Sequence, residues 1–261
     1  MKRQDSKQVN RTLVILLIII FAALLVVFAI NVSSVVSSAL QTKESMQFYE
    51  VLRERVHLNP RPIEPEVETE KIEPEIYLSP IDFDFLYSVN KDAAAWIQIE
   101  NTNIDFPVVQ CANNNYYLPL AFDKTENENG TIYMDCGNAK DFTDANTIIY
   151  GHNMVSGEMF NSLSHYKDQS FFEDHPKIKI YTTTAEYTYE VFAAYTTEYI
   201  SEAYTLNCDF GQYLSLVNER NILNTDTSVT TQDKILTLAT CDYSFDNARM
   251  VVHGKLLEDG K

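Results

Sequence analysis

The chain has 261 residues, enough for one good-sized hydrophobic core with accessory segments. Its formal net charge of −17 argues against nucleic acid as a partner, because phosphate binding needs basic patches. The sequence contains no calcium-loop pattern and no cluster of His and Cys with zinc spacing, so we expect no metal and no other cofactor.

The N-terminal region predicts a membrane anchor. Residues 13–30 read LVILLIIIFAALLVVFAI and carry no charge. A helix of about 20 apolar residues spans a hydrocarbon core of roughly 30 Å, so we expect a transmembrane helix over residues 12–31. Four basic residues and one acidic residue precede it, which predicts a cytoplasmic tail at residues 1–11 and an extracellular location for the rest of the chain. A cleaved signal peptide is the alternative, but its apolar region would be only about 7–15 residues long.

Residues 32–80 are expected to form an extracellular stalk. Within it, residues 42–58 place apolar side chains at helical spacing, which predicts an amphipathic helix close to the membrane. Five of the eight prolines of the chain then lie between Pro60 and Pro80, interleaved with glutamates. Such a segment cannot build a core, so we expect an extended spacer.

From residue 81 to residue 261 the sequence predicts one mainly β domain. Eight short runs are rich in Tyr, Thr, Ile, Val and Phe, and several alternate with period two. The runs are AAAWIQIE, FPVVQ, GTIYMD, NTIIYGH, KIKIYTTT, EYTYEVFAAYTT, KILTLAT and RMVVHGKLL. They favour a closed or nearly closed β-barrel over a parallel sheet. Asp209–Leu223 interrupts the β pattern with a plausible Asp cap and one apolar face, so a helix is expected between two late strands.

Three residues with reactive side chains lie at the ends of these runs. Cys241 follows a buried β-segment, His152 follows the run NTIIY, and Arg249 opens the last strand. A thiol nucleophile needs a proton-handling neighbour and a donor for the oxyanion, which a histidine and an arginine supply. Taken singly, Cys241 would be a buried thiol, His152 a structural histidine and Arg249 a surface cation. Only the combination of the three indicates catalysis.

The same residues resemble the sortases, membrane-anchored cysteine transpeptidases of Gram-positive bacteria. Thr237, Leu238, Ala239, Thr240 and Cys241 match the family pattern TLxTC, with Gly-His-Asn upstream and Arg249 on the next strand. The class B branch is the most similar. The resemblance implies a sortase-like eight-stranded β-barrel over residues 81–261, with an N-terminal helical extension and a helix inserted between late strands.

The resemblance also implies a chemistry. Cys241 would attack a threonine carbonyl in a sorting motif of the LPxTG or NPxTN type on a secreted protein. His152 would protonate the departing amine, and Arg249 would hold the oxyanion. The thioacyl-enzyme would pass to an amine of peptidoglycan precursor. A pilin-polymerising sortase, with a pilin lysine as acceptor, is the nearest alternative within the family.

Peptide-groove positions carry over from class B relatives as well. They are Asn114, Leu118, Tyr150, Tyr199, Ile200, Ala239, Thr240 and Asp242. At Ala239 the chain departs from the family, whose class B members usually have serine before the Thr-Cys pair. The missing hydroxyl affects the motif that is accepted and leaves the thiol chemistry unchanged.

Two readings of a different kind stay open beside this one. A papain-like peptidase would place its cysteine before its histidine, which is the reverse of the order here. A non-catalytic membrane-tethered binding domain would bury Cys241 as an unreactive thiol. The other cysteines, Cys111, Cys136 and Cys208, are expected either to form one disulfide or to be buried as small apolar side chains.

Overall fold

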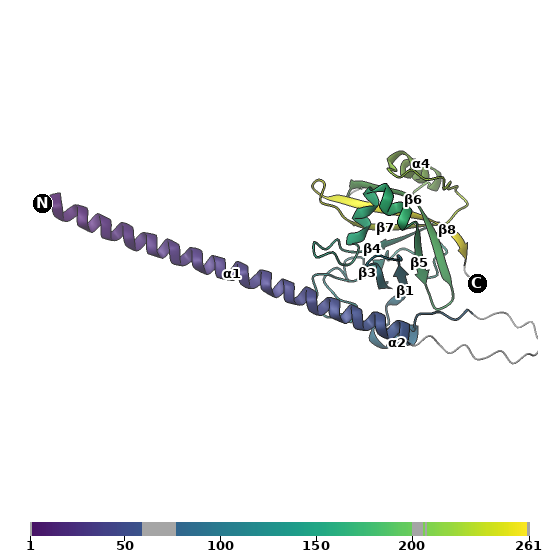
Figure 1. Cartoon of the computed structure of the whole chain (residues 1–261), viewed down its shortest axis with the longest axis horizontal. Helices are drawn as coiled ribbons and strands as arrows, with labels where there is room; N and C mark the ends of the chain where they lie inside the picture. The colour runs from purple at the N-terminus through teal and green to yellow at the C-terminus, as the bar shows by residue number, and fades with distance from the viewer. Residues whose placement is uncertain (1, 59–76, 200–205, 207, 260–261) are drawn as a thin grey trace, which may run out of the picture. The chain divides into compact units, whose positions relative to one another are not determined.

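The computed structural model describes residues 2–58, 77–199, 206 and 208–259 (Figure 1). The chain divides into two compact units, Met1–Glu44 and Ser45–Lys261. One helix, α1 (Lys2–Leu58), begins in the first unit and ends in the second.

The first unit is helical and holds the predicted span. Within the described residues, one helical segment is apolar and long enough to cross a membrane, with a mean hydropathy of 3.6 in its most apolar window. Its large apolar side chains, from Leu13 to Leu40, are exposed in the unit itself. The amphipathic helix expected at residues 42–58 is present, but as the continuation of α1.

The second unit begins at Ser45, earlier than the expected domain boundary at residue 81. Tyr49, Leu52 and Val56 are buried in the main core of this unit. The Tyr49 ring packs edge-on against Phe106 at 5.3 Å between centroids, and its hydroxyl donates to the Gly130 carbonyl at 3.2 Å. The last four turns of α1 are therefore part of the β-domain, because the barrel covers their apolar stripe.

Eight strands form a closed barrel, as the sequence predicted (Figure 1). They are β1 (Ala93–Gln98), β2 (Asp105–Val109), β3 (Ile132–Met134), β4 (Asn146–Tyr150), β5 (Lys177–Tyr181), β6 (Glu186–Glu198), β7 (Ile235–Cys241) and β8 (Ala248–Asp259). Their order around the barrel is β1-β2-β3-β4-β7-β8-β6-β5. Strands β4 and β7 pair in parallel, while β7 and β8 pair antiparallel. Closure leaves no unpaired edge among these eight strands. The pairings of β7 with β4 and with β8 bring the ends of β4 and β7 next to the start of β8.

The helix expected between late strands is α4 (Phe210–Arg220). The Asp209 carboxylate caps it by accepting a hydrogen bond from the backbone N–H of Gln212 at 2.9 Å. Tyr213, Leu214 and Val217 are buried in a second, smaller apolar cluster. Both the cap and the apolar face of this helix are legible in the sequence, which is why its position was predicted.

Three short helices were not predicted: α2 (Phe83–Val89), η1 (Asn161–Lys167) and α3 (Gln169–Asp174). No helix or strand was predicted for the segment that contains η1 and α3. Each of these helices is seven residues or fewer, so each shows at most two turns of apolar periodicity. Their buried side chains become recognisable as helical only once the barrel covers them.

A buried polar network joins β7 and β8 beneath α4. His253 is fully buried, and its ring nitrogens lie 3.0 Å from Thr237 Oγ1 and 3.0 Å from the Tyr195 hydroxyl. The Thr237 hydroxyl donates to Asn146 Oδ1 at 2.7 Å. His253 Nδ1–H therefore donates to Thr237, and Nε2 accepts from Tyr195. Burial lowers the pKa of His253 from 6.5 to about 3, so the imidazole is neutral.

Candidate active site

A cleft of about 770 Å³ opens where β4 and β7 end and β8 begins. It is lined by Asn114, Asn115, Leu118, Tyr133, Tyr150, Gly151, His152, Tyr199, Ala239, Thr240, Cys241, Asn247 and Arg249. The structure thus brings together all three residues predicted to be catalytic and most of those predicted to contact a peptide. These residues come from five separate stretches of the chain.

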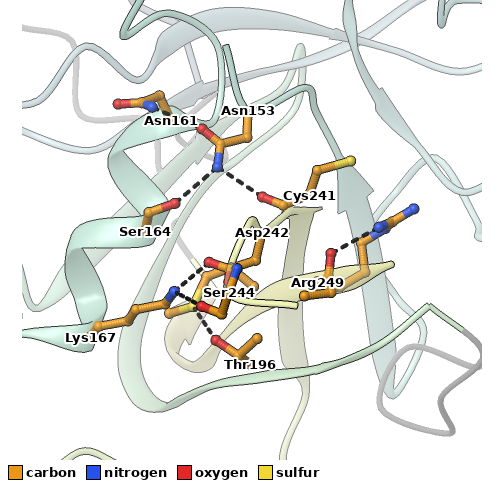
Figure 2. A network of polar contacts seen from close by, with 11 residues as sticks. Asn153, Asn161, Ser164, Lys167, Thr196, Cys241, Asp242, Ser244 and Arg249 are labelled. Carbon is orange, nitrogen blue, oxygen red and sulfur yellow. Dashed lines mark hydrogen bonds and ion pairs between the residues drawn. The ribbon is translucent and has the colours of Figure 1, made fainter. Parts of the chain in front are cut away.

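Cys241 and Arg249 face each other across the β-ladder. They are register partners at the ends of β7 and β8, and both are half-buried. The Arg249 guanidinium donates to the Ala248 carbonyl at 2.8 Å and lies 4.7 Å from the centre of the Tyr199 ring. Figure 2 shows the Cys241 sulfur directed away from its own carbonyl group, toward the side on which Arg249 lies. The β-ladder therefore places a thiol and a fixed cation at one edge of the cleft.

His152 follows β4 and Gly151, and one contact holds its ring. His152 Nε2 lies 3.0 Å from the Leu118 carbonyl oxygen. Because a carbonyl oxygen only accepts, Nε2 carries a proton and donates it. Gly130 packs beside this ring with a φ of +60°, and a Cβ there would lie 2.9 Å from His152 Cδ2 and 2.5 Å from the Leu118 oxygen. Only glycine fits this position, on grounds of both backbone conformation and space.

The parallel pairing of β4 with β7 brings the histidine loop next to the cysteine. Tyr150 is the register partner of Ala239, and the Gly151 N–H donates to the Ala239 carbonyl at 3.3 Å. One residue further, the Thr240 hydroxyl donates to the Gly151 carbonyl at 2.7 Å. These contacts continue the ladder past the end of the strand and fix His152 relative to Cys241.

Asp135 holds two walls of the cleft and was not predicted as a site residue. Its Oδ2 accepts hydrogen bonds from Asn114 Nδ2 at 2.9 Å and from the Tyr150 hydroxyl at 2.9 Å. The side-chain oxygen Oδ1 of Asn114 in turn accepts from the Cys136 N–H at 2.7 Å. No short sequence motif marks Asp135, because its partners lie 21 and 15 residues away in the chain.

Four residues that line the cleft were not predicted either: Asn115, Tyr133, Gly151 and Asn247. The Tyr133 ring lies 5.2 Å from that of Tyr150, and burial raises the pKa of the Tyr133 hydroxyl. Asn247 has a φ of 60° in the loop that leads into β8. An asparagine in the sequence is at most a weak sign of a left-handed turn, and it does not indicate that the residue lines a cleft.

Two residues predicted to bind peptide are not among the lining residues. Ile200 lies outside the described residues. Asp242 is 6% exposed and forms an ion pair with Lys167 of η1, and its Oδ1 accepts from the Ser244 N–H at 2.9 Å (Figure 2). Burial alone would raise the pKa of this carboxyl, but the hydrogen bonds from Lys167 and Ser244 outweigh it and hold the pKa below its ordinary value. The Asp242 carboxylate thus points toward η1, where it is paired with Lys167.

Each of the four cysteines carries a thiol and is not part of a disulfide. Cys241 and Cys111 are half-buried, whereas Cys136 and Cys208 are exposed. The expected burial is therefore wrong for Cys136 and Cys208, and the structure contains no disulfide among these four residues. Among the described residues, no group of three or more His, Cys, Asp and Glu side chains is arranged to hold a metal ion.

Comparisons with known proteins identify the family of the chain. A family model described as the sortase domain matches residues 97–257. The sortase B of Listeria monocytogenes is 37% identical over 178 residues, which cover 66% of this chain and 72% of that protein. The sortase B of Staphylococcus aureus is 35% identical over 182 residues, which cover 67% of this chain and 75% of that protein.

Solved structures give the same result for the fold. The crystal structure of Staphylococcus aureus sortase B complexed with MTSET matches at a TM-score of 0.73 and 30% identity, covering 85% of this chain and 92% of that chain. A sortase B-like protein of Bacillus anthracis matches at a TM-score of 0.68 and 31% identity, covering 84% and 98%. The barrel, the inserted helix and the relatives' sequences together place the chain in the sortase family, in the sortase B branch of cysteine transpeptidases.

Proposed function

We propose that the chain cleaves a C-terminal sorting motif of secreted proteins and transfers them to an amine of peptidoglycan precursor, using Cys241, His152 and Arg249. The observation that carries the proposal is the cleft at the ends of β4, β7 and β8, which all three side chains line. A Staphylococcus aureus sortase B has been solved as a substrate complex, which supports a peptide as the occupant of such a cleft.

In the first half-reaction, the Cys241 thiolate attacks the carbonyl carbon of the threonine in the sorting motif. The developing oxyanion accepts hydrogen bonds from the Arg249 guanidinium, whose planar fork suits a negatively charged oxygen. The C–N bond then breaks, His152 gives its proton to the departing amine, and a thioester joins the threonine to Cys241. Stacking of Arg249 against Tyr199 would keep the guanidinium aimed at that oxygen.

In the second half-reaction, an acceptor amine attacks the thioester. His152 takes a proton from that amine, the C–S bond breaks, and a new amide forms. The contact from Nε2 to the Leu118 carbonyl supports Nδ1 as the nitrogen that gives and takes the proton. Energy of the original peptide bond is conserved in the thioester, so transfer needs no nucleotide or other cofactor.

The peptide would lie between Asn114 and Leu118 on one side and Tyr199 on the other, above Tyr150, Ala239 and Thr240. All of these residues line the cleft. Ala239 is 4% exposed, and its side chain has no hydroxyl. It would therefore contact the substrate through packing and not through a side-chain hydrogen bond. We expect this position to alter the preference among sorting motifs.

The apolar segment of α1 would anchor the enzyme in the cell membrane of a Gram-positive bacterium, with its N-terminus in the cytoplasm and the β-domain outside. The length and composition of the helix support the span, and the positive charge before it supports the orientation. This location would place the cleft where secreted proteins emerge and where peptidoglycan precursor is presented.

The test presents a library of LPxTG- and NPxTN-type peptides to the full chain in a mild detergent. We expect a mass increase on Cys241 equal to the acyl fragment, and no such adduct in Cys241→Ala. If the wild type forms no adduct with any member of the library, although Cys241 reacts with a methanethiosulfonate at neutral pH, the transpeptidase proposal is wrong.

The acceptor is tested separately on the same acyl-enzyme. Short glycine peptides and peptidoglycan stem peptides are offered in parallel with a peptide that carries an internal lysine. Release of the acyl group onto the wall-derived amines supports cell-wall attachment. Selective release onto the internal lysine would support pilin polymerisation instead.

A further inference from the structure

No hydrogen bond connects His152 directly with Cys241 among the contacts of the described residues; their neighbours are connected instead. On one side, the Thr240 hydroxyl donates to the Gly151 carbonyl at 2.7 Å. On the other side, Asn153 Nδ2 donates to the Cys241 carbonyl at 2.8 Å. The residues before and after His152 are thus bonded to the last two residues of β7. The separation of imidazole and sulfur is set by this pair of bonds.

The Asn153 side chain is itself held in one orientation. It is 7% exposed, and its Oδ1 accepts from Asn161 Nδ2 at 2.8 Å. Asn161 Nδ2 also donates to the Met154 carbonyl at 3.0 Å, so it is the amide nitrogen of Asn161 that faces Asn153. Because Oδ1 of Asn153 faces Asn161, Nδ2 of Asn153 faces the other way, toward the Cys241 carbonyl and the Ser164 hydroxyl.

These bonds connect three segments of the chain at one point. Asn153 belongs to the loop after β4, Asn161 and Ser164 belong to η1, and Cys241 ends β7. In addition, the Tyr243 hydroxyl donates to the Asn153 carbonyl at 2.7 Å, which ties the loop after β7 to the same residue. Figure 2 shows Asn153 between Ser164 and the Cys241 carbonyl, with the sulfur on the opposite side of the Cys241 backbone.

From this geometry we propose that Asn153 is a positioning residue for the thiol transfer. It fixes the Cys241 carbonyl on the side away from the cleft, and so directs the Cα–Cβ bond and the sulfur into the cleft. It also ties the backbone after His152 to the same peptide group. A misplacement of about 1 Å between reacting groups lowers a rate by roughly a hundredfold. The inference depends on the proposed function for its chemistry, because it assigns no reaction of its own.

The decisive variant is Asn153→Asp, which keeps the size of the side chain. The carboxylate still accepts from Asn161, but it offers an acceptor where the Cys241 carbonyl needs a donor. The full chain in detergent is assayed for acyl transfer from a sorting peptide. Because the peptide contacts are elsewhere, we expect kcat to fall about 30- to 100-fold while KM stays within about twofold.

A matched control is Asn138→Asp. Asn138 is 8% exposed, and its amide also donates twice and accepts once, to Asp144, the Asn146 carbonyl and the Ile148 N–H. It does not line the cleft. We expect this variant to lose stability and to keep kcat within about twofold. An equal fall of kcat in both variants, a change in KM alone, or a kcat of Asn153→Asp within about threefold of the wild type would overturn the proposal.

Two further measurements keep the test independent of folding and of substrate. If Asn153→Asp does not fold, Asn161→Ala removes the donor that orients Asn153, and an unchanged kcat there overturns the proposal. If the wild type turns over no peptide, the rate at which a methanethiosulfonate labels Cys241, read by mass, replaces kcat. Slower labelling in Asn153→Asp than in Asn138→Asp then supports the positioning role, and equal labelling overturns it.

Discussion

Strands β7 and β8 carry two polar pairs in the same ladder, and the two pairs behave differently. Thr237 is the register partner of His253, and Cys241 is the register partner of Arg249, four residues later on β7 and four residues earlier on β8. The first pair is fully buried beneath α4, and every polar atom of its imidazole has a partner. The second pair lines an open cleft and leaves the sulfur facing it.

The two histidines beside these pairs show what the difference means for chemistry. His253 is buried in the protein interior, and a pKa of about 3 keeps its imidazole neutral, so the ring does not take up a second proton at neutral pH. His152 lies at the edge of the cleft with one nitrogen bonded to a carbonyl. A histidine is useful for proton transfer only where one nitrogen can reach the substrate. Burial and partners decide this, and residue type does not.

The largest expected effect separates the two histidines by substitution. His152→Ala should lower acyl transfer by about 10²- to 10⁴-fold, because it removes the residue that we propose as general acid and base. His253→Gln should leave transfer per folded molecule unchanged, because that side chain reaches no substrate. Steady-state transfer and thermal unfolding are measured on both. A comparable loss of transfer in His253→Gln would show that the buried network takes part in catalysis.

The next effect concerns Arg249, which pairs with Cys241 at the cleft. Arg249→Lys should lower kcat by about 10²- to 10³-fold, because a single ammonium cannot present two parallel donors to an oxyanion. Arg220→Lys is the control, since Arg220 donates to the Thr197 hydroxyl at 2.6 Å and does not line the cleft. Transfer kinetics at saturating peptide distinguish the two. Full activity of Arg249→Lys would exclude a bidentate role.

The buried pair of Thr237 and His253 should make the free energy of unfolding depend on pH. The folded-state pKa of His253 is below its unfolded value of 6.5, so the unfolded chain binds more protons as the pH falls. The free energy of unfolding should therefore drop by about 2 kcal/mol between pH 6.5 and pH 4.5 through this residue. Chemical denaturation at a series of pH values measures the slope. In His253→Gln, the contribution of His253 to this pH dependence should be absent. If the variant and the wild type show the same slope of unfolding free energy against pH, the buried imidazole is not neutral.

Thr237 gives a smaller effect on the same network. Thr237→Val keeps the shape of the side chain but removes the hydroxyl that bonds Asn146 and His253. We expect a loss of about 1–2 kcal/mol of stability, because buried partners are left unsatisfied. The exposed Thr231→Val should change stability by less than about 0.5 kcal/mol. Urea unfolding of both variants tests this, and labelling of Cys241 should stay unchanged in each.

The smallest effect belongs to the ion pair behind the cysteine. Lys167→Met should reduce stability by about 1 kcal/mol, since the Asp242 side chain is 3% exposed but that of Lys167 is 36% exposed. The pKa of Asp242 is below its ordinary value, so this contribution is present above about pH 4 and disappears as the pH falls through the folded-state pKa. Lys179→Met, in an exposed pair with Glu100, should cost less. A difference between Lys167→Met and wild type that persists in strong acid would contradict this account.

Much of the fold was predictable because the signals are local. Each of the eight strands coincides with a run of β-branched and aromatic residues, and α4 begins at the aspartate that the sequence marks as its cap. The apolar segment of α1 follows from eighteen uncharged residues in a row. In each case the evidence lies within about 20 residues, the range over which periodicity and capping act.

The supports of the site were not predictable, because their partners are distant in the chain. Asp135 acts through Asn114 and Tyr150, and Asn153 reaches Cys241 across 88 residues. Asp242 was expected in the peptide groove by resemblance, but Lys167, 75 residues away, holds it on the other side. The burial of Tyr49 by the barrel likewise depends on Phe106.

The sequence by itself determined the eight strands, the apolar helix and the pattern that singles out Cys241, His152 and Arg249, because hydrophobic patterning and residue chemistry are properties of short segments. Only the tertiary structure decided which histidine faces the cleft, which carboxylate is neutralised behind it, and which asparagine holds the cysteine in place. Those outcomes depend on strand pairing and packing between distant segments, since the β4–β7 and β7–β8 ladders bring the ends of β4 and β7 next to the start of β8, and α4 packs over the pair at Thr237 and His253.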